Sequence, residues 1–128
     1  MPSLIPFQLD RWFSEGFRKS NPAAVQRCVE VFLANDPAHY AKACAMLADA
    51  DLRNEVTKVR CPTTVVVGEF DYATPVSMAK DLANAISGAR LTIVSDAKHF
   101  APVEAPDAIV SALRDLARRA RDTAFSLS

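Results

Sequence analysis

The chain has 128 residues, of which 50% are hydrophobic and 23% are charged, a balance typical of one soluble globular domain. Fifteen basic residues balance fifteen acidic ones, so no net charge favours nucleic acid or a membrane surface as a partner. No segment approaches the roughly 20 apolar residues of a membrane span, and the opening residues do not form a signal peptide. The three cysteines are widely spaced without a zinc-site pattern, which predicts buried, reduced thiols in a cytoplasmic protein.

The first part of the sequence predicts helices only. Apolar residues recur at helical spacing in three stretches, at about 8–19, 22–34 and 37–49. Asn21-Pro22 and Asp36-Pro37 mark the starts of the second and third helices, because each places a capping side chain before a proline at the first helical position. A short turn at 51–56 ends this helical segment.

The second part of the sequence alternates between strands and helices. Short β-branched or apolar runs at 63–67 and 90–95 predict two strands. Thr74-Pro75 predicts the start of a helix that continues to about 87, and a last helix is expected over about 106–120. The arginines of this last helix are expected to face solvent: Arg114, Arg118, Arg119 and Arg121. The order strand, helix, strand, helix indicates an α/β fold with parallel strands.

Two parallel strands are too few to make a complete sheet. Apolar parallel strands are normally covered on both faces and paired within a larger sheet. We therefore expect a partner chain or a second copy of this chain to complete the sheet, or else a chain that is only marginally stable alone.

Each predicted strand is followed by a residue capable of acid or base chemistry. Asp71 comes shortly after Gly68, and His99 follows the turn at 96–98. The carboxyl ends of parallel strands are where α/β proteins build their sites. An aspartate that orients a histidine, and a histidine that takes a proton from a nucleophile, are two members of a Ser-His-Asp triad. Judged alone, Asp71 is more often a turn or capping residue in such a position.

Several pieces of the sequence stand in a characteristic order over roughly 9–116. They are Arg11-Trp12-Phe13, Tyr40 and Cys44 followed by Asp49-Ala50-Asp51-Leu52-Arg53, Cys61-Pro62-Thr63, Gly68-x-x-Asp71-x-x-x-Pro75, Gly88-Ala89-Arg90, and His99 followed by Glu104-x-Pro106. Together they resemble the C-terminal part of an α/β-hydrolase, most like the 3-oxoadipate enol-lactonases. Carbon–carbon bond hydrolases, haloalkane dehalogenases and cofactor-free haloperoxidases share the aspartate and histidine positions, and the run at 49–53 favours the lactonases by resemblance.

The resemblance implies a partial α/β-hydrolase fold in which residues 1–56 are a helical lid and residues 57–128 are the C-terminal part of the core. It implies that Asp71 is the acid and His99 the general base of an ester or lactone hydrolase. The substrate would be a small ester or lactone, bound once an N-terminal half completes the enzyme. No metal or organic cofactor is implied, because hydrolysis in this family uses side chains and water.

The nucleophile that the resemblance implies cannot be found in the sequence. The family carries it in a G-x-S-x-G turn between an earlier strand and its helix, and none of the three glycines stands in that pattern. Ser14 precedes Gly16 but lies in a helical pattern, and neither Ser77 nor Ser95 has such a turn. Loss of the nucleophile costs about a million-fold in turnover, so we expect the isolated chain to be inactive or nearly so.

Some interpretations stay open. The chain could instead be a shortened, non-catalytic descendant that acts as a self-associating or binding module. Lys98 departs from the small residue usual in the family and is expected to be an exposed loop lysine, with a contact to the imidazole or to a substrate carboxylate as alternatives. Trp12, Phe13 and Phe17 either line a pocket under the lid or form the packing face of a helix. His39 is expected at the surface or in packing.

Overall fold

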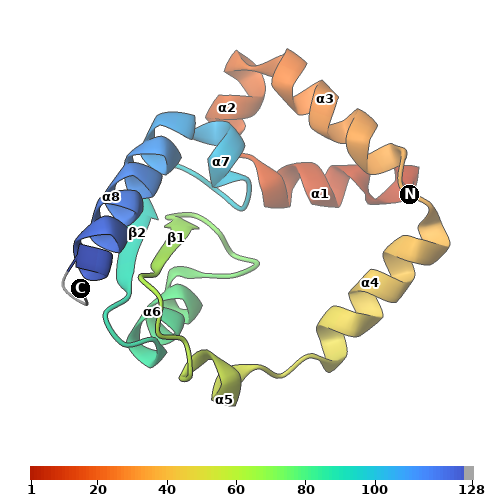
Figure 1. Ribbon diagram of the computed structural model, residues 1–128. Coiled ribbons are helices and arrows are strands. Elements are labelled where there is room, and N and C mark those ends of the chain that lie inside the picture. Colours follow the sequence, from red (N-terminus) through yellow and green to blue (C-terminus); the bar gives the residue numbers. More distant parts are fainter. Residues whose placement is uncertain (126–128) are drawn as a thin grey trace.

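The computed structural model describes residues 1–125, with side chains described through residue 122. Its elements are η1 (Pro2–Leu4), α1 (Ile5–Trp12), α2 (Glu15–Ser20), α3 (Pro22–Leu33), α4 (Pro37–Asp49), α5 (Arg53–Val56), β1 (Thr64–Gly68), α6 (Val76–Ala85), β2 (Arg90–Val94), α7 (Ala101–Glu104) and α8 (Pro106–Phe125). Figure 1 shows the two strands flanked by α6 and α8, with α1 to α5 forming an open arc around the other side. The predicted α/β order is confirmed, and β1 and β2 pair in parallel.

The two faces of the sheet are covered by different helices. Val65 and Val67 of β1 pack with Ala79 of α6. Val66 points the other way, into a cluster that includes Ile109 of α8. The strand β1 therefore has the cover that parallel strands need on both faces, whereas Ile93 of β2 is 43% exposed. Within the described residues, β1 pairs only with β2, so its other edge has no partner strand.

The first helical stretch differs from the prediction of one helix at about 8–19. The chain becomes extended at Phe13, which ends α1, and Ser14 then caps α2 by accepting a backbone hydrogen bond at 3.3 Å. The break lets Trp12 and Phe13 both turn inward, where they are 6% and 0% exposed. Asp36 caps α4 as predicted, whereas the Asn21 side chain makes no capping bond to α3.

A cluster of aromatic rings joins the N-terminal helices to the segment that follows β2. Trp12, Phe13 and Phe32 form its buried centre, with Phe100 and Val103 packed against it. The rings of Trp12 and Phe100 stack with their centroids 4.7 Å apart. Trp12 and Phe13 thus form a packing face, which is one of the two roles expected for them.

The helix α4 contrasts with this cluster, because nearly all of its residues are exposed. Met46 and Leu47 are 64% and 69% exposed. Cys44 on α4 and Cys61 before β1 are exposed and Cys28 is partly buried, so the prediction of buried thiols is wrong. No helix in the described part of the chain has the length and apolar character needed to cross a membrane.

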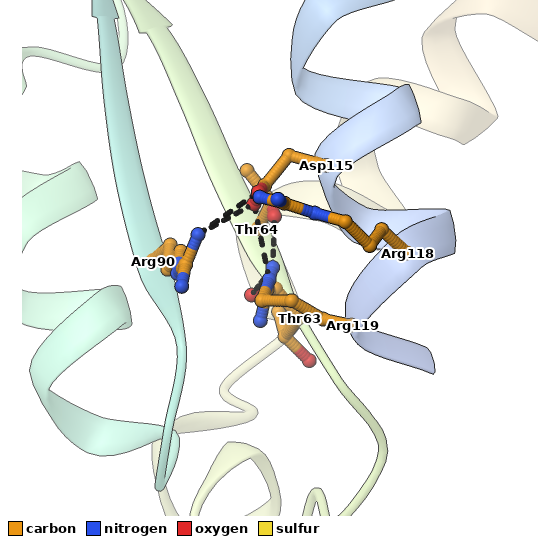
Figure 2. Close-up of polar contacts among 6 residues, drawn as sticks. All are labelled: Thr63, Thr64, Arg90, Asp115, Arg118 and Arg119. Atoms are coloured by element: carbon orange, nitrogen blue, oxygen red, sulfur yellow. Dashed lines mark hydrogen bonds and ion pairs between the residues drawn. The ribbon is translucent and has the colours of Figure 1, made fainter. Parts of the chain in front are cut away.

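A polar cluster holds α8 against the start of both strands (Figure 2). The carboxylate of Asp115 accepts hydrogen bonds of 2.8 to 3.1 Å from three arginines, Arg90, Arg118 and Arg119. Arg119 also donates to the carbonyl of Thr63 at 3.0 Å and to the hydroxyl of Thr64. Its side chain is only 15% exposed, so the prediction of a solvent-facing arginine is wrong at this position. The contact with the strand explains the difference, because the guanidinium binds the start of β1 through the Thr64 hydroxyl and the Thr63 carbonyl, which also accepts the N–H of Arg90 at 3.1 Å.

Candidate functional site

Asp71 lies in the turn that follows β1, at the carboxyl end of the sheet. Its Oδ1 accepts the backbone N–H groups of Ala73 and Thr74 at 2.9 and 3.0 Å, and its Oδ2 accepts the hydroxyl of Thr74 at 2.8 Å. Thr74 is therefore not the cap of α6, which begins at Val76 with Pro75 in the capping position. Asp71 shapes a turn, and its carboxylate still has room for one more donor.

That further donor is His99, which follows β2. Its Nδ1 lies 2.8 Å from Asp71 Oδ2 and 3.4 Å from the hydroxyl of Thr74. The side chain of Asp71 is 5% exposed, whereas that of His99 is 28% exposed. The structure thus brings together the two residues that the sequence singled out, with the carboxylate buried and the imidazole open on one side.

The carboxyl group of Asp71 favours its ionised form. Burial opposes ionisation, but hydrogen bonds from the Thr74 backbone, the His99 ring and the Thr74 hydroxyl outweigh it, so the pKa of Asp71 lies below its ordinary value. An ionised carboxylate can only accept, so Nδ1 of His99 is the donor. This arrangement leaves Nε2 as the nitrogen able to take a proton. In the described part of the chain no group forms a hydrogen bond with Nε2.

The two turns that carry Asp71 and His99 lie unusually close. The backbone N–H of Phe70 donates to the carbonyl of Ala97 at 2.9 Å. A Cβ added at Gly68 would lie 2.3 Å from the carbonyl oxygen of Lys98, so only glycine fits here. Asp96 adopts a left-handed backbone with a φ of 59°, and its N–H donates to the Glu69 carboxylate at 3.2 Å. Backbone contacts, rather than side chains alone, set the distance between the Asp71 carboxylate and the His99 imidazole.

A cavity of about 240 Å³ opens beside this pair. It is lined by Asp71, Thr74 and His99 together with Val66, Val67, Gly68, Ala101, Pro102 and Ile109. None of these residues is a serine or cysteine, and the Thr74 hydroxyl is bonded to Asp71. Ser14 caps α2, Ser77 lies in α6 and Ser95 follows β2, so the structure assigns none of them to this cavity.

Lys98 is not the exposed loop lysine that the sequence predicted. Its side chain is 18% exposed, and its Nζ donates to the backbone carbonyl and the carboxylate of Asp10 at 2.6 and 3.0 Å. The ammonium also lies 5.6 Å from the centre of the Tyr72 ring. Hydrogen bonding and charge from Lys98 place the pKa of Asp10 below its usual range. The end of α1 therefore binds the ammonium of Lys98. His39, by contrast, is exposed, within the range of expectation.

Two further residues support the site, and only one of them carries a local signal in the sequence. Thr74 stands three positions after Asp71, the spacing at which a hydroxyl and an N–H can both reach an aspartate in a turn. Glu104 accepts the backbone N–H of Lys98 at 2.6 Å, a contact that no local pattern indicates.

Several known proteins are similar to this chain, although no family model matches it. The 3-oxoadipate enol-lactonase 1 of Acinetobacter baylyi is 31% identical over 111 residues, which are 86% of this chain and 41% of that protein. The crystal structure of the enol-lactonase from Burkholderia xenovorans LB400 superposes with a TM-score of 0.88 and 31% identity, over 92% of this chain and 45% of that one. A thermophilic esterase from Thermogutta terrifontis superposes with a TM-score of 0.81 and 26% identity, over 93% of this chain and 43% of that one. The chain thus spans less than half the length of the relatives it matches.

Proposed function

We propose that this chain, which has part of the α/β-hydrolase fold and is similar to 3-oxoadipate enol-lactonases, supplies the acid and base of an ester or lactone hydrolase. The observation that carries the proposal is the 2.8 Å contact between Asp71 Oδ2 and His99 Nδ1 at the carboxyl end of two parallel strands. In this proposal residues 1–56 are the lid segment and residues 57–128 are the C-terminal part of the core. The exposed thiols of Cys44 and Cys61 suit a reducing, cytoplasmic compartment.

The proposed chemistry starts with a proton transfer. Nε2 of His99 takes the proton of a serine hydroxyl as the oxygen attacks the carbonyl carbon of a small ester or lactone. Asp71 holds the ring in the correct tautomer and stabilises the imidazolium. His99 then gives the proton to the leaving alkoxide oxygen. Water, activated by the same nitrogen, attacks the acyl group and releases the serine.

The serine would come from outside the described residues. The cavity beside His99 is lined by no serine or cysteine. Among the described residues, the edge of β1 that faces away from β2 pairs with no other strand. A further strand on this edge, with a nucleophile in the turn after it, would complete both the sheet and the triad. We therefore propose that a completing segment or partner chain docks along β1. The exposed apolar residues of α4 would be covered in the same assembly.

A fluorophosphonate probe tests this proposal, because it labels only an activated serine. The chain is incubated with the probe alone and with the part of the Burkholderia xenovorans enol-lactonase that lies outside the matched region. We expect the added part to be labelled only when this chain is also present. Labelling should be lost when the His99→Ala variant is used in place of the parent chain. Labelling of this chain by itself would show that it contains a nucleophile of its own. Equal labelling of the added part with the parent chain and with its His99→Ala variant would show that His99 is not the base.

The second candidate is a self-associating module without catalysis, and the exposure of α4 favours it. Met46 and Leu47 offer apolar surface that a second copy could cover. Sedimentation at micromolar concentration separates the two candidates. A stable homo-oligomer that dissociates in the Leu47→Glu variant and never binds the added part would support the module. A monomer that binds the added part would support the hydrolase.

A further inference from the structure

The backbone around His99 is bound to the end of the first helix. The N–H of His99 points to the carbonyl of Arg11 at 3.4 Å, and the N–H of Phe100 donates to the carbonyl of Trp12 at 2.9 Å. The residue before His99 is bound as well, because the N–H of Lys98 donates to Glu104. Three successive N–H groups around the imidazole are therefore occupied.

Glu104 connects this loop to the junction of α1 and α2. Its Oε2 accepts the N–H of Lys98 at 2.6 Å, and its Oε1 accepts the N–H of Ser14 at 2.7 Å. Both bonds are partly buried, and both join a charged acceptor to a backbone donor, a combination stronger than a neutral hydrogen bond. One carboxylate thus holds two segments together, and Ser14 lies 90 positions from Glu104 in the chain.

We propose that Glu104 is a positioning residue for His99, fixing the backbone next to the base by clamping Lys98 and Ser14 at once. The proposal rests on the proposed function, because it assumes that His99 is the base. Glu104 touches neither the imidazole nor the cavity beside it, so its effect passes through the backbone of the loop.

The chemistry of the clamp requires a carboxylate. Two N–H groups point at one side chain, and a carboxylate offers an acceptor to each. Glutamine has nearly the same shape but only one acceptor oxygen, so its amide NH₂ would face one of the two N–H groups. Glu104→Gln therefore breaks one arm of the clamp with almost no change in volume.

The test uses the ¹⁵N-labelled chain and two signals. The first is hydrogen exchange of the Lys98 amide, which we expect to speed up about tenfold or more in Glu104→Gln. The second is the low-field proton of His99 Nδ1–H, which reports the bond to Asp71 and which we expect to broaden or disappear. The matched control is Glu55→Gln, which changes an exposed glutamate paired with Lys58 and should leave both signals as they are.

A second pair of variants acts on the other end of the clamp. Ser14 has a φ of −62° and follows an extended Phe13, so the backbone there suits proline. Proline removes the N–H and the hydroxyl and puts a ring carbon where the N–H now meets Glu104. Ser14→Ala removes the hydroxyl cap but keeps the N–H. We expect the His99 Nδ1–H signal to weaken in Ser14→Pro and to stay sharp in Ser14→Ala.

The outcomes are decisive in each direction. Faster exchange at Lys98 with an unchanged His99 signal would make Glu104 merely structural and overturn the proposal. If Glu104→Gln unfolds the chain, seen as lost amide protection in β1, the two Ser14 variants decide, and equal His99 signals in them overturn it. These signals need no serine and no completing chain, so failure of the probe labelling would count against the hydrolase and leave this test intact.

Discussion

Each end of the small sheet carries a carboxylate that accepts several hydrogen bonds. The two carboxylates differ in burial and in the chemistry of the side chains that bind them. At the carboxyl end, Asp71 is 5% exposed and is held by its own turn and by one imidazole. At the opposite end, Asp115 is 26% exposed and is surrounded by three arginines.

The difference separates a chemical arrangement from a structural one. The arginines around Asp115 cannot lose a proton near neutral pH, so that cluster can only hold α8 on the strands. The partner of Asp71 is a histidine at the edge of the cavity, whose ring can donate through one nitrogen while the other accepts a proton. Burial keeps water from competing for Asp71, while solvent and salt reach the partly exposed Asp115 cluster more easily.

The largest expected difference between the two carboxylates is in the turnover of the proposed hydrolase. Asp71→Asn leaves the volume of the side chain but favours the wrong tautomer of His99, so we expect turnover of the reconstituted enzyme to fall about 10⁴-fold. Asp115→Asn is the matched change at the other end and should leave turnover within about twofold of the parent. Rates of ester hydrolysis with the added part present measure both. Equal losses in the two variants would mean that Asp71 acts only on stability.

The next effect concerns the close approach of the two turns. In Gly68→Ala the new Cβ would meet the backbone of Ala97 and Lys98, which cannot move aside as a side chain can, and we expect a loss of about 1–3 kcal/mol in the free energy of unfolding. Gly16 in α2 has no atom within 4 Å of an added Cβ, so Gly16→Ala should be neutral or stabilise by about 0.5–1 kcal/mol. Urea denaturation compares the two glycines directly. A stable Gly68→Ala chain with an intact His99 Nδ1–H signal would show that the turns tolerate separation.

Local sequence patterns were sufficient to predict the parallel strands and to place Asp71 and His99 at their ends. Asp71 and His99 each follow an apolar strand, and the parallel order of the strands brings those ends together. The partners of Lys98 and Glu104 could not be predicted in this way, because they lie 88 and 90 positions away in the chain. Their contacts depend on how the N-terminal helices fold back, which no local pattern encodes.

The helix ends show the same limit on a smaller scale. Asp36 caps its helix as the local pattern predicts. The break at Phe13 and the use of Thr74 on Asp71 follow instead from tertiary contacts, the burial of aromatic rings and the demand of a buried carboxylate for donors. Thr74 could either cap α6 or bond Asp71, and a local pattern does not decide between these two roles.

A smaller effect is expected from acid. The pKa of Asp71 is lowered in the folded chain, so its contribution to stability is full above the ordinary aspartate pKa of about 4 and is lost as the pH falls through the lower folded value. The pKa of Asp115 is lowered as well, chiefly by hydrogen bonding from Arg118. The pKa of Asp51 falls to about 2 through its bonds to Arg53. We expect the melting temperature to stay level from neutral pH to about 5 and to drop below about 4. Asp71→Asn should make that drop shallower, and an equally steep drop would show that Asp71 does not take part.

The smallest effect should come from the arginine cluster, and salt separates it from the site. Asp115 and its partners are reached by solvent, so Asp115→Asn should lower the melting temperature only slightly, and ions at about 1 M should screen most of the difference from the parent. The bonds to Asp71 are buried, so the deficit of Asp71→Asn should persist at the same salt concentration. Thermal melts at low and high salt give both values. If the deficit of Asp115→Asn also persisted, its bonds with Arg119, whose side chain is 15% exposed, would be as protected as those at the other end. Burial would then no longer distinguish the two ends, and the chemistry of the partner, imidazole or guanidinium, would be the remaining difference between them.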